Sequence, residues 1–319
     1  MPPRPPDSQA PRPQEGITLL GGPQTGKTTF LAALQIALLH AEHLGWSVGG
    51  NDPASTQAMI GFMDTMTRLH AFPRPTREQL EKYKWVLTGD TRRVWVWDRW
   101  LPRREDRTTR IPLDVVDGPG GAADNSKGFT AGLGQDLVQS MASSAGLIIF
   151  FDPLMEVERG ETFQHLYGAL RTVRDQLTPR GKLPHYVAVC ITKYDAVPVY
   201  RSAVAMRVVE QSPDGQRFPY VPESDAEDFL RALIKKSSGD DASLIPKMIK
   251  QTFYKDRVRF FVTSAIGFYV ATPDGVFDGN DYQNHVRGKP DRIRGGVYPI
   301  NVVEPVLWLG NHVAKATRQ

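Results

Sequence analysis

Nearly unbroken apolar runs recur along the chain and alternate with stretches of helical spacing. These runs lie at 17–20, 145–152, 186–195 and 257–267. Between them, the segment 161–177 repeats apolar side chains every three to four residues, as an amphipathic helix does. Strands that are apolar along their whole length and alternate with helices are typical of a mainly parallel sheet covered on both faces. The pattern therefore predicts an α/β fold.

One pair of strands interrupts this alternation with helices. The segments RRVWVWDRWL at 92–101 and TTRIPLDVV at 108–116 each read as a strand, and the short polar run PRRED lies between them. Two strand-like runs joined by a short polar connection predict a β-hairpin. We therefore expect one antiparallel hairpin in the sheet.

Composition and charge narrow the classes of protein. The 319 residues suffice for one large α/β domain with insertions or for two small domains. The net charge of +4 comes from basic and acidic residues that are interleaved, which argues against a nucleic-acid-binding surface. The longest apolar run, 145–151, is too short to cross a bilayer, and the N-terminus has no apolar signal core. We therefore expect a cytoplasmic protein that binds no nucleic acid and has no membrane span.

The residue types that most often carry metal or redox chemistry are sparse. The single cysteine, Cys190, lies inside an apolar run, which predicts a packed core thiol. His165 and His185 stand apart from any metal-ligand spacing, so we interpret both as structural. Candidate chemistry must therefore come from other motifs.

A glycine-rich loop between a strand and a helix gives the first chemical signal. Residues 21–28, GGPQTGKT, match the pattern GxxxxGK[ST], in which backbone N–H groups surround a phosphate at a helix N-terminus. Lys27 would reach the β- and γ-phosphates, and the Thr28 hydroxyl would bind Mg²⁺. The loop residues expected to contact nucleotide are Gly21, Gly22, Pro23, Gln24, Thr25, Gly26, Lys27, Thr28 and Thr29. The loop alone does not distinguish ATP from GTP.

A second motif follows the strand at 108–116. It reads Asp117-Gly118-Pro119-Gly120, a DxxG sequence. A carboxylate that leaves a buried strand can hold Mg²⁺ through water, and the Gly120 N–H would face a γ-phosphate. Tetrapeptides of this kind are common, so the prediction depends on the position of this one directly after a strand.

Two further motifs follow later strands and point to a guanine base. Thr192-Lys193-Tyr194-Asp195 matches [NT]KxD, in which the lysine stem packs over a purine and the aspartate accepts hydrogen bonds from guanine N1 and N2. Adenine would instead present an acceptor at N1. Thr263-Ser264-Ala265 matches an SA element whose backbone amide contacts the guanine oxygen. We therefore expect GTP or GDP to contact Thr192, Lys193, Asp195, Ser264 and Ala265.

The four motifs, in this order, resemble the translation-factor and Ras-like class of P-loop GTPases over residues 17 to about 267. Longer stretches, among them LLGGPQTGKTTFLAAL, LPHYVAVCITKYD and FFVTSAIGFYV, resemble the double-GTPase family of actinobacterial genomes. The resemblance implies a P-loop NTPase sheet with helices on both faces. It also implies partner proteins in NTP-dependent conflict or signalling systems.

Relative to a minimal domain of that class, the chain carries additions. An insertion covers about 46–75, and MIGFMDTMTRL within it has the apolar spacing of a helix that packs on the core or offers a partner surface. The stretch RGGVYPINVVEPVLWL predicts that an extension over about 268–319 ends in a helix. Residues 1–15 are proline-rich and predict a disordered tail, or alternatively a polyproline docking segment. We expect 16–319 to form a single extended domain.

The residue after DxxG bears on the rate of hydrolysis. In Ras-like proteins a glutamine often stands there and orients the attacking water. This chain has Gly121, which has no side chain for that task. Hydrolysis is therefore expected to be slow unless Asp124, Asn125 or a partner supplies the missing group.

A switch threonine that binds Mg²⁺ and senses the γ-phosphate is expected before the hairpin. Thr76, in AFPRPTREQL, is our choice because the prolines before it suit a loop. Thr88 and Thr91 are alternatives, and Thr76 could instead serve as a helix N-cap.

Together these motifs predict a Mg²⁺-dependent GTP-binding protein, a slow GTPase whose nucleotide state controls contact with a protein partner. Catalysis would depend on Lys27, Thr28, Asp117, Gly120 and Thr76, and the metal on Thr28, Asp117 and Thr76. A P-loop ATPase or kinase is one alternative, favoured by the glycine loop alone. A non-hydrolysing nucleotide-sensing or scaffold module is another, favoured by Gly121.

Overall fold

The structure is a computed structural model that describes residues 16–22, 24–41, 45–73, 81–90, 108–117, 134–155, 162–178, 181–235 and 244–316. The predicted tail, 1–15, lies outside these residues. The strands are β1 (Ile17–Leu20), β2 (Trp46–Gly50), β3 (Glu81–Asp90), β4 (Thr108–Asp117), β5 (Gly146–Phe151), β6 (Tyr186–Ile191), β7 (Glu210–Gln211), β8 (Pro219–Tyr220), β9 (Val258–Val262), β10 (His285–Val286) and β11 (Lys289–Ile293). The α-helices are α1 (Lys27–His40), α2 (Pro53–Thr67), α3 (Gly134–Ser143), α5 (Thr162–Leu177), α6 (Val197–Met206), α7 (Glu223–Lys235), α8 (Ile245–Thr252) and α9 (Val303–Ala316).

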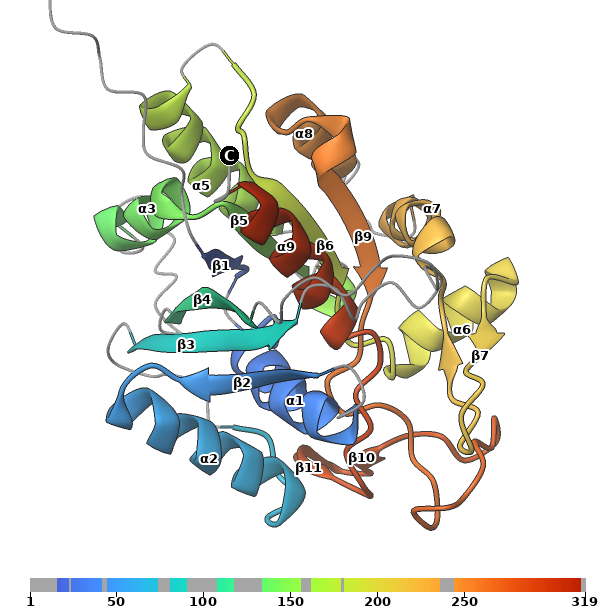
Figure 1. Cartoon of the computed structure of the whole chain (residues 1–319). Helices are drawn as coiled ribbons and strands as arrows, with labels where there is room; N and C mark the ends of the chain where they lie inside the picture. Colours follow the sequence, from blue (N-terminus) through green and yellow to red (C-terminus); the bar gives the residue numbers. More distant parts are fainter. Residues whose placement is uncertain are drawn as a thin grey trace, which may run out of the picture.

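In the described residues, seven strands form one sheet in the order β2-β3-β4-β1-β5-β6-β9 (Figure 1). From β4 to β9 in this order, each adjacent pair of strands is parallel. The two remaining strands are antiparallel, with β3 paired to β4 and β2 to β3. The predicted α/β fold, a mainly parallel P-loop NTPase sheet with an antiparallel hairpin, is confirmed.

The strand that pairs with β4 differs from the expected one. It is β3, which runs from Glu81 opposite Asp117 to Asp90 opposite Thr108, so the expected first strand at 92–101 is wrong as the partner. Both segments alternate apolar and polar residues, and period alone does not choose between them. In β3, Trp85 and Leu87 are almost fully enclosed in the core, which stabilises this strand in the sheet. Residues 91–107 lie outside the described residues.

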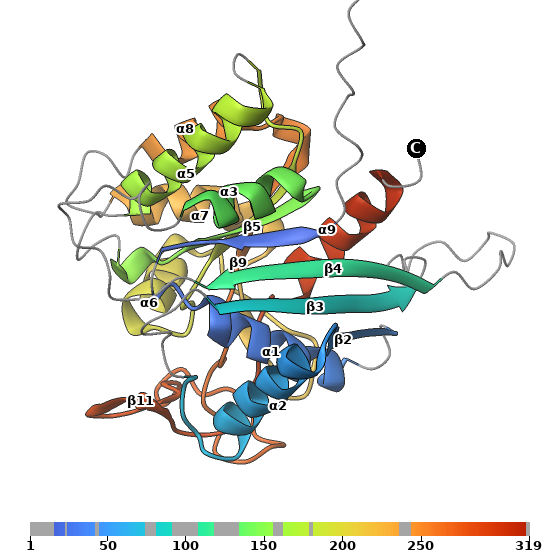
Figure 2. The same cartoon turned by 90° about the vertical axis from the view of Figure 1, so that its left-hand side faces the viewer.

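Helices cover both faces of the sheet. Figure 2 shows α3, α5 and α8 on one side and α1 and α2 on the other. Alternate residues of β5 serve the two sides: Leu147 and Ile149 belong to one apolar cluster, and Ile148 and Phe150 to the other. A strand buried on both faces has no polar alternation, which explains the apolar runs of the sequence.

The insertion forms β2 at the sheet edge and then α2. The carboxylate of Asp52 caps α2 by accepting a hydrogen bond from the Ser55 N–H at 2.8 Å, and Pro53 takes the first helical position. Met59 and Met66 of α2 are buried in the same cluster as α1. The predicted helix is therefore confirmed and packs on the core, whereas strand β2 was not anticipated.

The segment after β9 returns to the same sheet. Its final helix, α9, packs on the face of the sheet that α1 also covers. Before α9, the β10–β11 hairpin lies beside the insertion (Figure 1). An isolated antiparallel β-bridge between Ala71 and Arg292 joins the two. None of the described helices has the length and apolar character needed to cross a membrane.

Candidate nucleotide-binding site

The strands that precede the four motifs end at one edge of the sheet. The strands β4, β1, β6 and β9 are parallel, so their carboxyl ends lie on the same side, and each is followed by one motif. Ligands of open α/β sheets bind at this edge. The topology therefore directs the ends of strands that are far apart in the chain to one edge.

The glycine loop has a backbone that depends on its small residues. Gly26 has φ 94°, and Gln24 also has a positive φ, 60°. A Cβ on Gly21 would lie 2.7 Å from Thr25 Oγ1 and 2.9 Å from Phe150 Cβ, so the loop passes close to β5. No described side chain caps the N-terminus of α1. Its first N–H groups therefore suit a phosphate. Pro23 lies outside the described residues.

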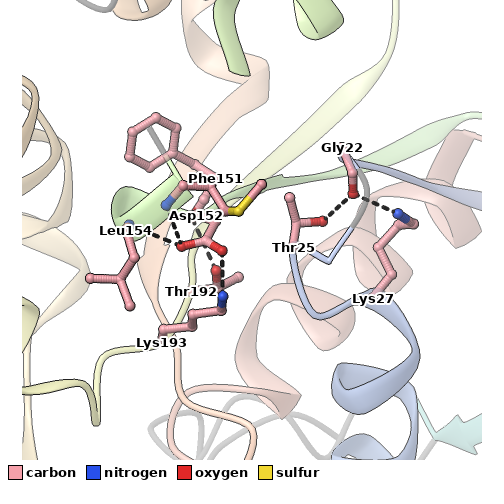
Figure 3. A network of polar contacts seen from close by, with 9 residues as sticks. Gly22, Thr25, Lys27, Phe151, Asp152, Leu154, Thr192 and Lys193 are labelled. Atoms are coloured by element: carbon pink, nitrogen blue, oxygen red, sulfur yellow. Dashed lines mark hydrogen bonds and ion pairs between the residues drawn. The ribbon is translucent and has the colours of Figure 1, made fainter. Parts of the chain in front are cut away.

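Lys27 folds back along this loop. Its Nζ donates to the carbonyl oxygens of Gly21 at 3.0 Å and Gly22 at 2.9 Å, and the residue is only 6% exposed. Thr25 Oγ1 donates to the same Gly22 oxygen at 2.9 Å (Figure 3). A phosphate oxygen is a stronger acceptor for an ammonium group than a neutral carbonyl is. The lysine is therefore placed where a bound phosphate can attract it.

The expected metal ligands are described in part. Thr28 is the second residue of α1, and β4 ends at Asp117. The parallel register of β1 with β4 pairs Ile17 with Leu113 and Thr18 with Asp114, so both strands run toward the same edge of the sheet. A hydroxyl and a carboxylate are both hard oxygen ligands that suit Mg²⁺. Gly120 and Thr76 lie outside the described residues.

The described alternative for the switch threonine lies far from this edge. Thr88 stands in β3 opposite Arg110, toward the amino end of β4. The motif loops follow the carboxyl ends, so Thr88 does not face them. Thr91, like Thr76, lies outside the described residues.

The [NT]KxD segment is fastened to the end of β5. The N–H and the Oγ1 of Thr192 both donate to the Phe151 oxygen, at 2.8 and 3.2 Å. The Lys193 Nζ lies 2.5 Å from Asp152 Oδ2, and the Asp152 side chain is fully buried. Asp152 Oδ1 also accepts the Leu154 N–H at 3.0 Å (Figure 3). Sequence reasoning missed Asp152, although an acid directly after a buried strand was the same signal that selected Asp117.

Asp195 is held by the SA segment. The Ser264 Oγ donates to Asp195 Oδ1 at 2.5 Å and accepts the Gly267 N–H at 2.8 Å. The Ser264 backbone also forms a two-way bridge with Ile300. The carboxylate is thus oriented by a serine that is itself fixed, and Ala265 follows next in the loop. An oriented carboxylate at this edge can accept two N–H groups from a base.

A residue of the extension also reaches Asp195. The Nε2 of His285 lies 3.3 Å from Asp195 Oδ2, and its ring stacks on Phe72 with centroids 5.3 Å apart. The neighbouring Asn284 is fully buried and donates to the oxygens of Ile266 and Gly296, which ties the β10–β11 hairpin to the SA loop. Local sequence patterns hold no signal for these contacts, since they join distant segments.

Fold and site together define a P-loop α/β protein. No known protein family matches the chain, and no curated protein matches it either. Among solved structures, the chain is similar to the S. cerevisiae Ski7 GTPase-like domain bound to GTP, with 13% identity, a TM-score of 0.40, and coverage of 95% of this chain and 51% of that one. It is also similar to the same domain bound to GDP and inorganic phosphate, with 12% identity, a TM-score of 0.35, and coverage of 80% and 44%. A third similar structure is the bacterial selenocysteine-specific elongation factor EF-Sec, with 14% identity, a TM-score of 0.32, and coverage of 79% of this chain and 26% of that one. The chain thus spans about half of these proteins or less.

Proposed function

We propose that this chain is a Mg²⁺-dependent GTP-binding protein that hydrolyses GTP slowly and acts as a nucleotide-controlled switch for a protein partner. The observation that carries the proposal is the Asp195 carboxylate, oriented by Ser264 at the sheet edge that also holds the glycine loop. A carboxylate accepts from guanine N1 and N2, whereas adenine N1 is itself an acceptor. This contrast favours GTP over ATP.

The phosphate end of the site is assigned to the glycine loop. Lys27 would bind the β- and γ-phosphates, and the loop N–H groups would surround them. Thr28, Asp117 and Thr76 would hold Mg²⁺, and Gly120 would face the γ-phosphate. Bound Mg²⁺ would offset charge that develops on the phosphate oxygens.

The hydrolysis step is expected to be slow. Gly121 follows the DxxG motif and has no side chain to orient water. Unstimulated Ras-like proteins hydrolyse GTP at rates on the order of 10⁻⁴ s⁻¹, and a partner can raise the rate strongly. We expect a rate in that range for the purified chain. A protein partner in the GTP state, and a place in a conflict or signalling system, follow from the family resemblance of the sequence.

The test begins with the nucleotide that co-purifies with the protein, identified by chromatography after denaturation. Calorimetry then compares GTP with ATP in the presence of Mg²⁺, and Lys27→Ala serves as the loop control. GTP preference with slow phosphate release in single-turnover experiments supports the proposal. ATP preference would favour an ATPase or kinase, and GTP binding without any phosphate release would favour a sensing module.

A further inference from the structure

The contact between His285 and Asp195 is the least expected feature of the site. His285 belongs to β10 in the extension, and its Nε2 lies 3.3 Å from Asp195 Oδ2. Its ring stacks on Phe72, with an interplanar angle of 24°. An aromatic nitrogen heterocycle whose nitrogen lies against the Asp195 carboxylate and whose ring stacks on a second ring resembles a purine in two kinds of contact.

Burial shows which partner of Asp195 can be exchanged. The Asp195 side chain is 5% exposed, so a base reaches the carboxylate edge only if a covering group moves. Ser264 is fully buried and fixed by hydrogen bonds to Gly267 and Ile300. His285 is 41% exposed, and its contact is longer than that of Ser264. His285 is therefore the group that an incoming base would replace.

The His285 hairpin is also joined to residues 69–72, which precede Thr76, the proposed switch threonine, in the sequence. The Ile293 N–H donates to the His70 oxygen at 2.8 Å, and the Phe72 N–H donates to the Asp291 oxygen at 3.3 Å. Arg292 Nη1 donates to the Leu69 oxygen at 3.0 Å. Phe72 lies only a few residues before Thr76 in the sequence. A movement of His285 would thus act on the segment that leads to the switch threonine.

We propose that His285 is a specificity-determining residue that competes with the guanine base for Asp195. The inference rests on the proposed GTP site. Guanine must replace the imidazole N–H at Oδ2, so His285 lowers the affinity for guanine nucleotides. Adenine nucleotides do not use the Asp195 acceptor, and His285 leaves their affinity unchanged. Because the His285 hairpin is hydrogen-bonded to residues 69–72, guanine binding and the position of these residues depend on each other.

The experiment measures GDP and ADP affinity by calorimetry for wild type, His285→Ala, His285→Phe and Arg287→Ala. GDP avoids hydrolysis during titration, and ADP differs only in the base. His285→Phe removes the donor but keeps a ring against Phe72, so it supports folding if the alanine variant does not. Arg287, exposed in the turn of the same hairpin, controls for a general loss of side-chain bulk and charge. Thermal unfolding measurements check that each variant is folded.

Both His285 variants should bind GDP about five- to tenfold tighter than wild type, as expected for removal of one competing polar contact. Their ADP affinity, and both affinities of Arg287→Ala, should equal those of wild type. Equal or weaker GDP binding by the His285 variants, or an equal rise in ADP affinity, would overturn the inference. A wild type without GDP preference would instead overturn the proposed function.

A measurement on the wild type needs no variant. The ¹⁵N NMR signal of the His285 imidazole should shift when GDP is added and stay in place when ADP is added. A GDP-bound protein in which that signal is unchanged would show that His285 keeps its contact with Asp195, which excludes competition.

Discussion

The ammonium of Lys193 lies 2.5 Å from the carboxylate of Asp152, and the two residues follow the neighbouring parallel strands β6 and β5. Asp152 is fully buried, whereas Lys193 is 37% exposed. The pair therefore joins a carboxylate that water does not reach to a lysine that reaches the surface. It fixes the lysine stem at the carboxyl edge of the parallel strands.

This asymmetry predicts unequal costs for the two partners. Lys193→Ala leaves a buried carboxylate without its cation, and we expect it to lower the free energy of unfolding by about 3 kcal/mol, at the low end for a broken buried pair. Asp152→Asn removes the buried charge and keeps an acceptor for the Leu154 N–H, so about 1 kcal/mol is expected. Urea unfolding measures both. The double variant should be more stable than Lys193→Ala, and the opposite order would contradict the assignment.

Gly267 is predicted to be irreplaceable beside the SA segment. Its φ is +67°, and a Cβ there would lie 1.9 Å from the Tyr298 oxygen. Gly267→Ala should cost more than about 2 kcal/mol of unfolding free energy and weaken GTP binding, since the Gly267 N–H holds Ser264. Gly288 is the matched control, with φ +77° and open space around the Cβ position. Gly288→Ala should cost only about 1 kcal/mol, and equal losses would disprove the steric argument.

Removal of the Lys27 ammonium group should abolish GTP binding or weaken it by about 100-fold or more. A buried ammonium would make strong charge-assisted hydrogen bonds to the phosphate oxygens. Lys27→Ala tests this by calorimetry, and the exposed Lys84→Ala is its control. Unchanged GTP affinity in Lys27→Ala would remove the phosphate assignment.

Loss of the Thr28 hydroxyl should act through the metal. We expect Thr28→Ala to weaken GTP binding mainly when Mg²⁺ is present, because the loop N–H groups remain. Titrations with Mg²⁺ and with EDTA separate the two contributions. The same loss under both conditions would argue against a metal role for Thr28.

The base preference should change when Asp195 becomes an amide. Asp195→Asn offers one acceptor and one donor, which mismatches guanine and suits the extra carbonyl of xanthine. The variant should lose GTP and gain XTP in competition binding. A GTP preference equal to that of wild type would mean that Asp195 does not read the base.

The burial of His185 leads us to expect that the free energy of unfolding falls in mild acid. Burial lowers the pKa of this histidine below its usual value near 6.5, although a hydrogen bond to the Met141 oxygen opposes the shift. Below about pH 6.5 the unfolded chain therefore binds a proton that the native state excludes, and the free energy of unfolding falls as the pH drops toward the native pKa. His185→Gln keeps a donor for Met141 and should lose less stability between pH 7.5 and 5.5. The same loss in both proteins would show that His185 does not carry the effect.

Local patterns in the sequence determined much of the fold. The helix at 161–177 and the strands β1, β5, β6 and β9 were all anticipated, because apolar period and glycine conformation are properties of neighbouring residues. The buried state of Cys190 followed in the same way. The position of each motif directly after a strand is also a local signal. Because parallel strands end at the same edge of a sheet, the sequence could place Lys27, Asp195 and Ser264 at one edge.

Tertiary structure decided the features that join distant segments. The strand expected beside β4 was 92–101, whereas the structure pairs β4 with β3, whose Trp85 and Leu87 are enclosed in the core. The contact of His285 with Asp195 arises because a hairpin in the extension packs on the SA loop and on the segment around Phe72. Such contacts depend on the closure of long loops and on burial in three dimensions, which leave no periodic trace in the chain.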